Sequence, residues 1–335
     1  MQHQYVARET GEVRTETLFA DRIVNLLYSK ARETVPVLLK ALTGARMSSV
    51  LGYVNYDFSL GSKLAGNSRF IETLGIDLNE CVDPLHTLNT PRAIFERKIC
   101  YWRKREMPND PAVVVSPADA KVLVGSLCDQ QALFIKDKFF DFEELLGKDR
   151  RHWLDEFHRG DFAVFRLTPE KYHYNHSPVA GEVVDIYELE GGYHSCNPGA
   201  IVALATPYSK NKRVVTVIDT DVPNGTGVGL VAMVEVVALM IGEIVQAYSD
   251  ERYANPRNVR VGQFLRRGAP KSLYRPGSST DVLIFQRGRV RFDSDLVSNM
   301  YNQHATSRFS RGFGMQLVET DVRVRSSIAR AVRRY

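Results

Sequence analysis

Hydrophobic positions divide the chain into two parts with different periodicity. Over residues 15–80, apolar residues recur three or four positions apart, as at Ile23, Leu26 and Leu27, and this spacing predicts amphipathic helices. A second helical stretch is expected over residues 90–107. Prolines at 108 and 111 then mark the expected end of a helical N-terminal region, residues 1–110.

From residue 111 onward, short apolar or β-branched runs replace the helical pattern. Pro, Gly, Asn and Asp separate these runs, which is typical of strands joined by turns. The runs are 113–115, 122–124, 162–165, 181–186, 214–218 and 228–237, with one helix expected at 141–146. We therefore expect an α+β protein. Its helical N-terminal region would pack on a β-rich, barrel- or sandwich-like domain over residues 111–335.

Composition and charge narrow the class of protein. A hydrophobic fraction of 44% and a charged fraction of 25% are ordinary for a globular chain of 335 residues. The net charge of +5 is too weak to indicate nucleic-acid binding, but it suits an anionic membrane surface or an acidic substrate. The four cysteines have no CxxC spacing, which indicates neither a zinc site nor a disulfide framework and favours a reducing compartment.

The hydrophobic pattern also indicates how the chain could interact with a membrane. Residues 1–13 are polar and lack an apolar signal core, and no apolar run approaches the length of a bilayer span. The apolar stripe over residues 18–42 is interleaved with basic residues, which would let a helix lie in a membrane interface. An ordinary helix with a solvated charged face gives the same pattern, so both interpretations stay open. The arginine-rich tail from Asp321 is expected to be a loosely held, solvated end.

Three polar segments interrupt the β-rich part. Residues 277–280 form a small-residue turn that leads into the apolar strand 282–285. Asp119 lies in a tight turn between two apolar strands. His173 and His176 lie in a segment bracketed by prolines, and no Cys or third His has metal-ligand spacing to them, so we expect no metal. A pair of structural histidines in a loop is the alternative.

Taken together, these segments resemble the pyruvoyl-dependent phosphatidylserine decarboxylases over nearly the whole chain. The stretch Arg267–Thr280 fits the family pattern K-G-x-x-K-G-x-F-x-F-G-G-S-T without a gap. The other matching segments are Tyr5–Glu12 (R-x-T-G-E), Ile94–Lys98 (F-F-x-R-K-L), Ser116–Asp119 (S-P-x-D-G), Tyr172–His176 (Y-H-R-x-H), Gly192–Pro198 (G-x-x-Y-S-V-N-P) and Asn211–Arg213 (N-E/K-R).

The resemblance implies a self-processing reaction at Ser279. The Ser279 hydroxyl would attack the carbonyl of Ser278, and elimination from the resulting ester would leave a pyruvoyl group, the covalent cofactor. His176 would act as the base and Asp119 would orient it, following the logic of a Ser-His-Asp triad. The products would be a β fragment, residues 1–278, and an α fragment, residues 279–335, which would stay associated.

The resemblance also implies the substrate and the place of action. The enzyme would convert phosphatidylserine to phosphatidylethanolamine and CO2 through a Schiff base to the pyruvoyl group. His173 would engage the substrate carboxylate or deliver the proton. The implied partner is phosphatidylserine in an anionic membrane surface, with the protein peripheral on the cytoplasmic face and a homodimer left open. The alternatives are a soluble relative that acts on a free amino acid and a non-processing lipid-binding relative.

The chain departs from the family pattern around these residues. Ala120, Ser272 and Ser278 each replace a glycine, and Tyr174 and Asn175 replace the usual arginine and apolar residue between the histidines. Serine has less backbone freedom than glycine, so the change at 278 bears on processing. The changes around the histidines bear on which substrate is accepted.

Overall fold

The structure, a computed structural model, describes residues 2–18, 76–128, 138–203, 206–238, 243–276 and 279–332. Its elements in chain order are β1 (Gln4–Ala7), β2 (Val13–Thr15), the 3₁₀ turns η2 (Leu78–Glu80) and η3 (Leu85–Thr87), α5 (Pro91–Phe95), α6 (Tyr101–Lys104), β3 (Val113–Val115), β4 (Ala120–Ser126), α8 (Phe142–Leu146), α9 (Arg151–Glu156), β5 (Asp161–Leu167), β6 (Tyr174–His176), β7 (Gly181–Leu189), α10 (Pro198–Ala203), α11 (Pro207–Lys210), β8 (Arg213–Asp219), β9 (Leu230–Val236), β10 (Ile244–Gln246), β11 (Phe264–Leu265), β12 (Pro270–Tyr274), β13 (Ser279–Phe285), β14 (Val290–Phe292), α12 (Ser294–Met300), α13 (Arg308–Phe313), β15 (Glu319–Val322) and β16 (Ser327–Ala331). Every apolar run predicted as a strand contains or overlaps one of these strands.

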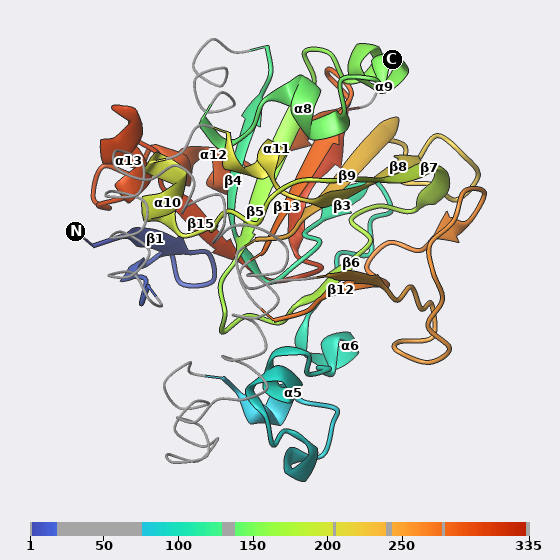
Figure 1. The fold of residues 1–335 in the computed structure, drawn as a ribbon, viewed down its shortest axis with the longest axis horizontal. Helices are drawn as coiled ribbons and strands as arrows, with labels where there is room; N and C mark the ends of the chain where they lie inside the picture. The colour runs from blue at the N-terminus through green and yellow to red at the C-terminus, as the bar shows by residue number, and fades with distance from the viewer. Residues whose placement is uncertain are drawn as a thin grey trace.

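Ten strands form one large sheet in the order β11-β7-β8-β9-β13-β5-β4-β15-β1-β2 (Figure 1). The order ends at β11 and β2, which do not pair with each other, so the described strands form an open sheet. The expectation of a barrel is therefore wrong for the described part of the chain. Inward and outward residues alternate in the same way in an open sheet and in a barrel, so the pattern alone could not decide closure.

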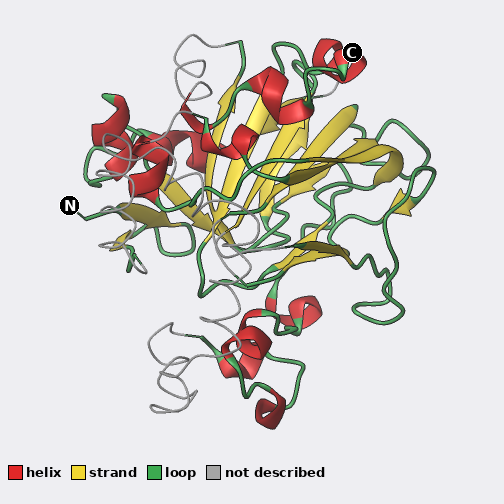
Figure 2. Ribbon diagram, in the orientation of Figure 1, coloured by secondary structure: helices red, strands yellow, loops and turns green. Residues whose placement is uncertain are grey.

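Two layers cover the large sheet, which makes the protein α+β. On one face, Glu235 of β9 forms an ion pair with Lys271 of the smaller sheet β10-β12-β6. On the opposite face, Arg213 of β8 donates a hydrogen bond to the carbonyl of Leu145 in α8. Figure 2 shows the small sheet on one side of the large sheet and α8, α10 (Pro198–Ala203) and α11 on the other, whereas α5 and α6 lie beyond the small sheet. A third sheet, β14-β16-β3, contains the C-terminal strand.

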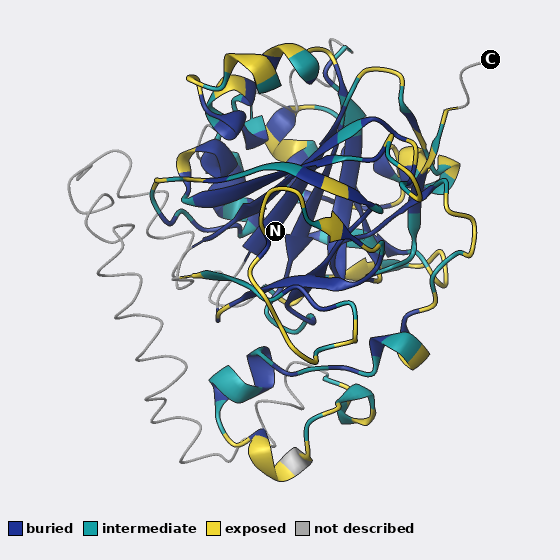
Figure 3. Ribbon diagram, turned by 90° about the vertical axis from the view of Figure 1, so that its right-hand side faces the viewer, coloured by how far each residue is buried: buried dark blue, intermediate teal, exposed yellow. Residues whose placement is uncertain are grey.

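The core lies along the central strands of the large sheet, which are almost wholly buried (Figure 3). All seven residues of β13 are buried, although the first three, Ser279, Thr280 and Asp281, are polar. Strands buried on both faces usually consist of apolar residues. Three polar residues at the start of the central strand therefore need a reason other than packing.

The helix expected at 141–146 is confirmed as α8, whose first turn is capped by the Asp141 side chain. The helical stretch expected over 90–107 is present as the two short helices α5 and α6. Most of the N-terminal helical region, including the membrane-docking stretch 18–42, lies outside the described residues. Residues 4–7 and 13–15 form strands of the large sheet. None of the helices in the described ranges has the length and hydrophobicity needed to cross a bilayer.

The arginine-rich tail is not a loose, solvated end over its described length. Residues 319–322 and 327–331 are the strands β15 and β16. Between them, Arg325 donates hydrogen bonds to the carbonyls of Tyr101 and Arg105. The expectation from charge alone was wrong because guanidinium groups can donate to backbone carbonyls as well as to water.

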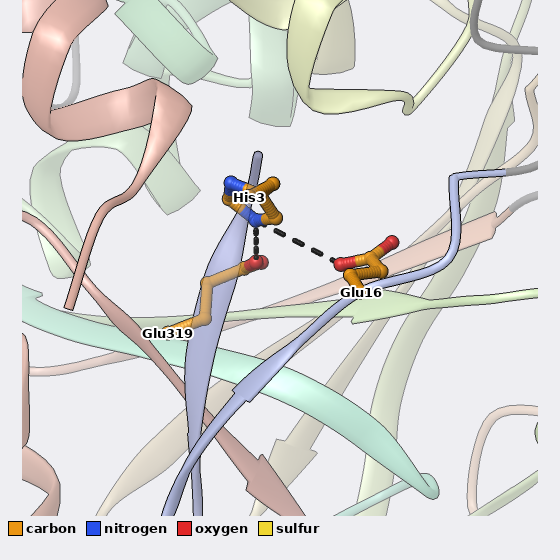
Figure 4. A group of neighbouring side chains, drawn as sticks. All are labelled: His3, Glu16 and Glu319. Atoms are coloured by element: carbon orange, nitrogen blue, oxygen red, sulfur yellow. Dashed lines mark hydrogen bonds and ion pairs between the residues drawn. The ribbon is translucent and has the colours of Figure 1, made fainter. Parts of the chain in front are cut away.

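A buried ion-pair network joins the two ends of the chain to the sheet. His3 lies 2.8 Å from Glu319 and 3.7 Å from Glu16 (Figure 4). Arg166 of β5 bonds to both carboxylates at 2.6 Å. The ligand atoms of His3, Glu16 and Glu319 are close enough together to hold a metal ion. Because Arg166 and Lys121, which lies 3.8 Å from Glu16, together supply two positive charges for the two carboxylates, we interpret the group as an ion-pair network.

We predict that Arg166→Met destabilises the protein by about 3–5 kcal/mol, because it removes the cation that bonds directly to both buried carboxylates. Urea unfolding measures the change. Arg323→Met is the matched control, since Arg323 pairs with Glu9 but both side chains are at least half exposed. Equal shifts in the two variants would contradict a stabilising role for the buried network.

Candidate active site

Ser279 is the first residue of β13 and pairs with Leu167 of β5. Its side chain is fully buried, and its Oγ has no hydrogen-bond partner among the described residues. Buried hydroxyls are almost always hydrogen-bonded, so an orphan of this kind calls for an explanation. Gly277 and Ser278 lie outside the described residues, so the peptide bond between Ser278 and Ser279 has no description.

The face of β13 that carries Ser279 points toward the small sheet. Side chains alternate along a strand, so Ser279 and Asp281 share one face. Asp281 pairs with Glu235 of β9, which reaches Lys271 of β12 at 2.6 Å. His176 lies on β6, the neighbour of β12 in that small sheet. Ser279 therefore faces the small sheet. Asn175 of β6 bonds to Glu235 and so faces the large sheet, which puts the His176 ring on the opposite face of β6, away from Ser279.

His176 is held as a neutral base with a defined tautomer. Its Nδ1 lies 2.9 Å from the carbonyl of Gly268. A carbonyl can only accept, so Nδ1 carries the hydrogen and Nε2 keeps its lone pair, 2.9 Å from the Tyr172 hydroxyl. Burial lowers the pKa of His176 to about 3. The ring is therefore neutral at physiological pH, which is the state that a general base needs.

Asp119 is ionised but does not bond to His176. Arg105 contacts its carboxylate twice, at 3.0 and 2.7 Å, and the Val324 amide donates to it at 2.8 Å. Burial is the largest single influence and acts to raise the pKa of Asp119, but the charge of Arg105 and the hydrogen bonds from Arg105 and the Val324 amide together hold the pKa below its ordinary value. The turn is nevertheless adjacent to the histidine, because the His176 amide donates to the Pro117 carbonyl.

The structure thus places His176 next to the turn that carries Asp119, with Ser279 across the small sheet, and does not join the three as a hydrogen-bonded triad. Among the described residues, no hydrogen bond links His176 to Asp119 or to Ser279. The carbonyl of Gly268 holds the His176 ring in the place where Asp119 was expected. A backbone carbonyl leaves no mark in the sequence, so this contact could not be predicted.

His173 is buried in an unusually apolar setting. Its ring stacks on Phe95 with 3.5 Å between centroids. Neither ring nitrogen has a hydrogen-bond partner within the described ranges. Burial, and then the Arg97 charge, lowers the pKa of His173 well below its ordinary value. The imidazole is therefore neutral, although an interaction with the Lys171 backbone acts in the opposite direction.

A buried polar cluster adjoins the Ser279 face. Glu235 receives hydrogen bonds from Lys271, from Ser272 and from Asn175. Burial acts to raise the pKa of Glu235, but the charge of Lys271 and these three hydrogen bonds together lower the pKa below its ordinary value and keep the carboxylate ionised. Ser272 and Asn175 are two of the positions where the chain departs from the family pattern, and both departures supply hydrogen bonds to one carboxylate.

Asp281 holds its proton because it is buried next to the charged Glu235. The Tyr274 hydroxyl accepts from the Val236 amide and lies 2.9 Å from the Thr280 carbonyl, which can only accept. The same hydroxyl is the donor in the 2.7 Å contact with Asp281 Oδ1, and this hydrogen bond acts to lower the pKa of Asp281. Burial, followed by the Glu235 charge, raises the pKa of Asp281 well above its ordinary value. Its Oδ2 has no partner in the described structure.

Sequence reasoning missed Glu235 and Asp281 as residues of this region. The available signal was an acidic residue within an apolar strand run, 228–237 for the first and next to 282–285 for the second. Such residues are rarely buried without a partner or a function. The matched motifs already contained Arg97, Tyr172 and Lys271, but the sequence did not indicate what each of them contacts.

A known protein family matches this chain. The family model of phosphatidylserine decarboxylase matches residues 92–307, which is more than half of the chain. The chain belongs to the phosphatidylserine decarboxylase family and is a carboxy-lyase. The family resemblance inferred from the motifs is confirmed.

Curated relatives extend the match beyond that range. A phosphatidylserine decarboxylase proenzyme of Fusobacterium nucleatum is 27% identical over 304 residues, covering 90% of this chain and 94% of the relative. One of Chlamydia trachomatis serovar L2 is 29% identical over 329 residues, covering 97% and 96%. Phosphatidylserine decarboxylase proenzyme 3 of Schizosaccharomyces pombe is 28% identical over 302 residues, covering 87% of this chain and 28% of that protein.

We predict that the free energy of unfolding depends on pH through the ionisation of Asp281. The folded state holds the Asp281 proton more tightly than the unfolded chain does. The resulting stabilisation is complete below the unfolded pKa, about 3.9, and is lost as pH rises toward the folded value. Relative to Asp281→Asn, the unmodified protein should lose up to about 1.4 kcal/mol of unfolding free energy for each pH unit in that window.

Urea unfolding of both proteins over roughly pH 5 to 8 tests this, because the other titrating groups are shared and cancel in the difference. Parallel stability curves would show that Asp281 is ionised in the folded protein.

Proposed function

We propose that the chain is a self-processing phosphatidylserine decarboxylase whose pyruvoyl group is made from Ser279. The observation that carries this proposal is the fully buried Ser279 hydroxyl, which has no hydrogen-bond partner in the described chain and begins the central strand. The proenzyme name of the relatives supports the processing step. When formed, the group supplies an electrophilic carbonyl that takes up the electrons left when CO2 departs.

Processing uses the residues of the uncleaved chain. The Ser279 oxygen bonds to the carbonyl carbon of Ser278 while the peptide C–N bond breaks, which gives an ester. His176 takes the hydroxyl proton on Nε2. Loss of the Ser279 α-proton then expels the carboxylate of residue 278, and water replaces the nitrogen of residue 279 with release of ammonia. The charge of Asp119 opposes the fall in the pKa of His176 and so stabilises the imidazolium.

The fragments of such a cleavage, 1–278 and 279–335, would remain interlocked. Strand β13 would belong to the smaller fragment, yet it pairs with β5 on one side and β9 on the other. Strand β15 of the same fragment lies between β1 and β4. Separating the fragments would require opening the large sheet at both places, so we propose a stable two-chain enzyme.

The apolar setting of His173 suits loss of a carboxylate. A carboxylate brought against Phe95, away from water, loses hydration that neutral CO2 does not need. The two unbonded ring nitrogens of His173 can then carry a proton to the carbon that loses CO2. We assign His173 to decarboxylation and His176 to processing.

The proposed function also implies where in the cell the protein acts. Phosphatidylserine keeps its acyl chains in lipid, so the protein would lie on an anionic membrane surface, peripheral on its cytoplasmic face. The stretch 18–42 would dock there as part of an N-terminal region, 1–110, attached to the catalytic domain, 111–335. A homodimer remains compatible with this arrangement.

Two serine variants test the site of cleavage. Ser279→Ala should stay full length, because no oxygen is left to attack the preceding carbonyl. Ser278→Ala is the matched control and should still be cut. Intact-mass measurement should find a fragment that begins with a pyruvoyl group at 279 in the control alone. Cleavage of Ser279→Ala, or a break before residue 278, would overturn the assignment.

Two histidine variants separate the reactions. His176→Ala should remain uncleaved, because Ser279 loses its base. His173→Ala should be cleaved but decarboxylate at least about 100-fold more slowly, the usual cost of losing a proton-transfer group. Gel analysis measures cleavage, and release of CO2 from phosphatidylserine measures decarboxylation. Normal processing in both variants would exclude His176 as the base.

The low pKa of His176 gives a further test of its proposed role as the base in processing. A base with a pKa of about 3 is neutral at all higher pH, so the rate of processing should not fall between about pH 7 and 5. A tenfold fall for each pH unit in that range would indicate a base with an ordinary histidine pKa.

A further inference from the structure

Arg97 is a buried cation without an anionic partner. Its side chain is 6% exposed, and it donates to two backbone carbonyls, Ile94 at 3.0 Å and Glu170 at 2.9 Å. No carboxylate of the described chain lies within ion-pair distance of it. A buried charge is costly unless an opposite charge compensates it. Burial accordingly lowers the pKa of Arg97.

The acidic residues nearby are committed elsewhere. Glu80 and Asp119 both bind Arg105, each at 2.7 Å. The carboxylate of Glu170 faces Lys121 at 3.7 Å and accepts from Thr168. The guanidinium of Arg97 is therefore fixed in position by carbonyls while its charge is left for an anion that the described chain does not supply.

Arg97 also borders the candidate active site. It lies two residues after Phe95, whose ring stacks on His173. Arg97 also donates to the carbonyl of Glu170, which lies three residues before His173. Its charge is one of the causes of the low pKa of His173. Figure 1 shows α5, which ends at Phe95, on the side of the small sheet that faces away from the large sheet.

We propose that Arg97 receives the phosphodiester group of the substrate headgroup, which deepens the proposed function and rests on it. The planar guanidinium matches two oxygens of a phosphate group. The carboxylate is the less suitable ligand, because a strong ion pair would stabilise the charge that the reaction must remove. The phosphodiester is unchanged by decarboxylation, so Arg97 can hold it from substrate to product.

This assignment makes Arg97 a specificity residue. A free amino acid has the amine and the carboxylate but no phosphodiester, so it would leave the guanidinium unpaired. A buried cation left unpaired costs more than a lost contact at the surface. The site should therefore favour a phospholipid headgroup over free serine.

The test measures binding to the purified, processed protein by calorimetry. The probes are glycerophosphoethanolamine, which has the phosphodiester but no carboxylate, and ethanolamine, which lacks both. Arg97→Gln should weaken binding of glycerophosphoethanolamine at least about tenfold and leave ethanolamine unchanged. Arg97→Lys should lose less than Arg97→Gln. Arg92→Gln, on the helix α5 that precedes Arg97, is the matched control and should bind as the unmodified protein does.

Several outcomes would overturn the proposal. Unchanged glycerophosphoethanolamine binding in Arg97→Gln would exclude it, and equal losses for both probes would indicate a structural role alone. If Arg97→Gln does not fold, a loss in Arg97→Lys that is equal for both probes excludes it too. Displacement by inorganic phosphate at equal concentration would show a general anion site.

These outcomes are separate from the proposed function. Cleavage at Ser279 and CO2 release by the unmodified protein test that function directly, and Arg97→Gln should still be cleaved. Binding that depends on Arg97 in a protein that does not decarboxylate would uphold the headgroup site and reject the function.

Discussion

The rest of the structure depends on the position of β13 between β5 and β9. Ser279 begins this strand, and seven residue pairs on one side and six on the other hold it in the large sheet. A chain that cuts itself before Ser279 would leave the new terminus anchored by those pairs. The central strand thus fixes the reactive residue in place whether or not the peptide bond before it is intact.

Burial then assigns a protonation state to each group around that strand. Where no countercharge is near, burial keeps the group neutral, as it does for His173, His176 and Asp281. Where a cation lies within bonding distance, the carboxylate stays charged, as for Asp119 beside Arg105 and Glu235 beside Lys271. Neutral bases and fixed charges therefore lie close together, an arrangement typical of sites for proton transfer.

The sequence predicted local features well and contacts between distant segments poorly. The strand runs and the helix α8 follow from periodicity and from the cap at Asp141, which are short-range effects. Whether the sheet closes into a barrel depends on segments that are more than 200 positions apart. The same is true of the hydrogen bond that Arg325 donates to the Tyr101 carbonyl. The family resemblance selected Ser279, His176 and Asp119. It could not show that Arg105 binds Asp119 or that a backbone carbonyl holds His176.

The central claim is that residue 279 becomes the electrophile that reacts with the lipid amine. The most direct measurement is to incubate the purified protein with phosphatidylserine and cyanoborohydride and then to map the modified residue by mass spectrometry. The account predicts a reduced lipid amine on residue 279, at the start of the fragment 279–335. An adduct on a lysine, or no adduct on a protein that still releases CO2, would contradict it.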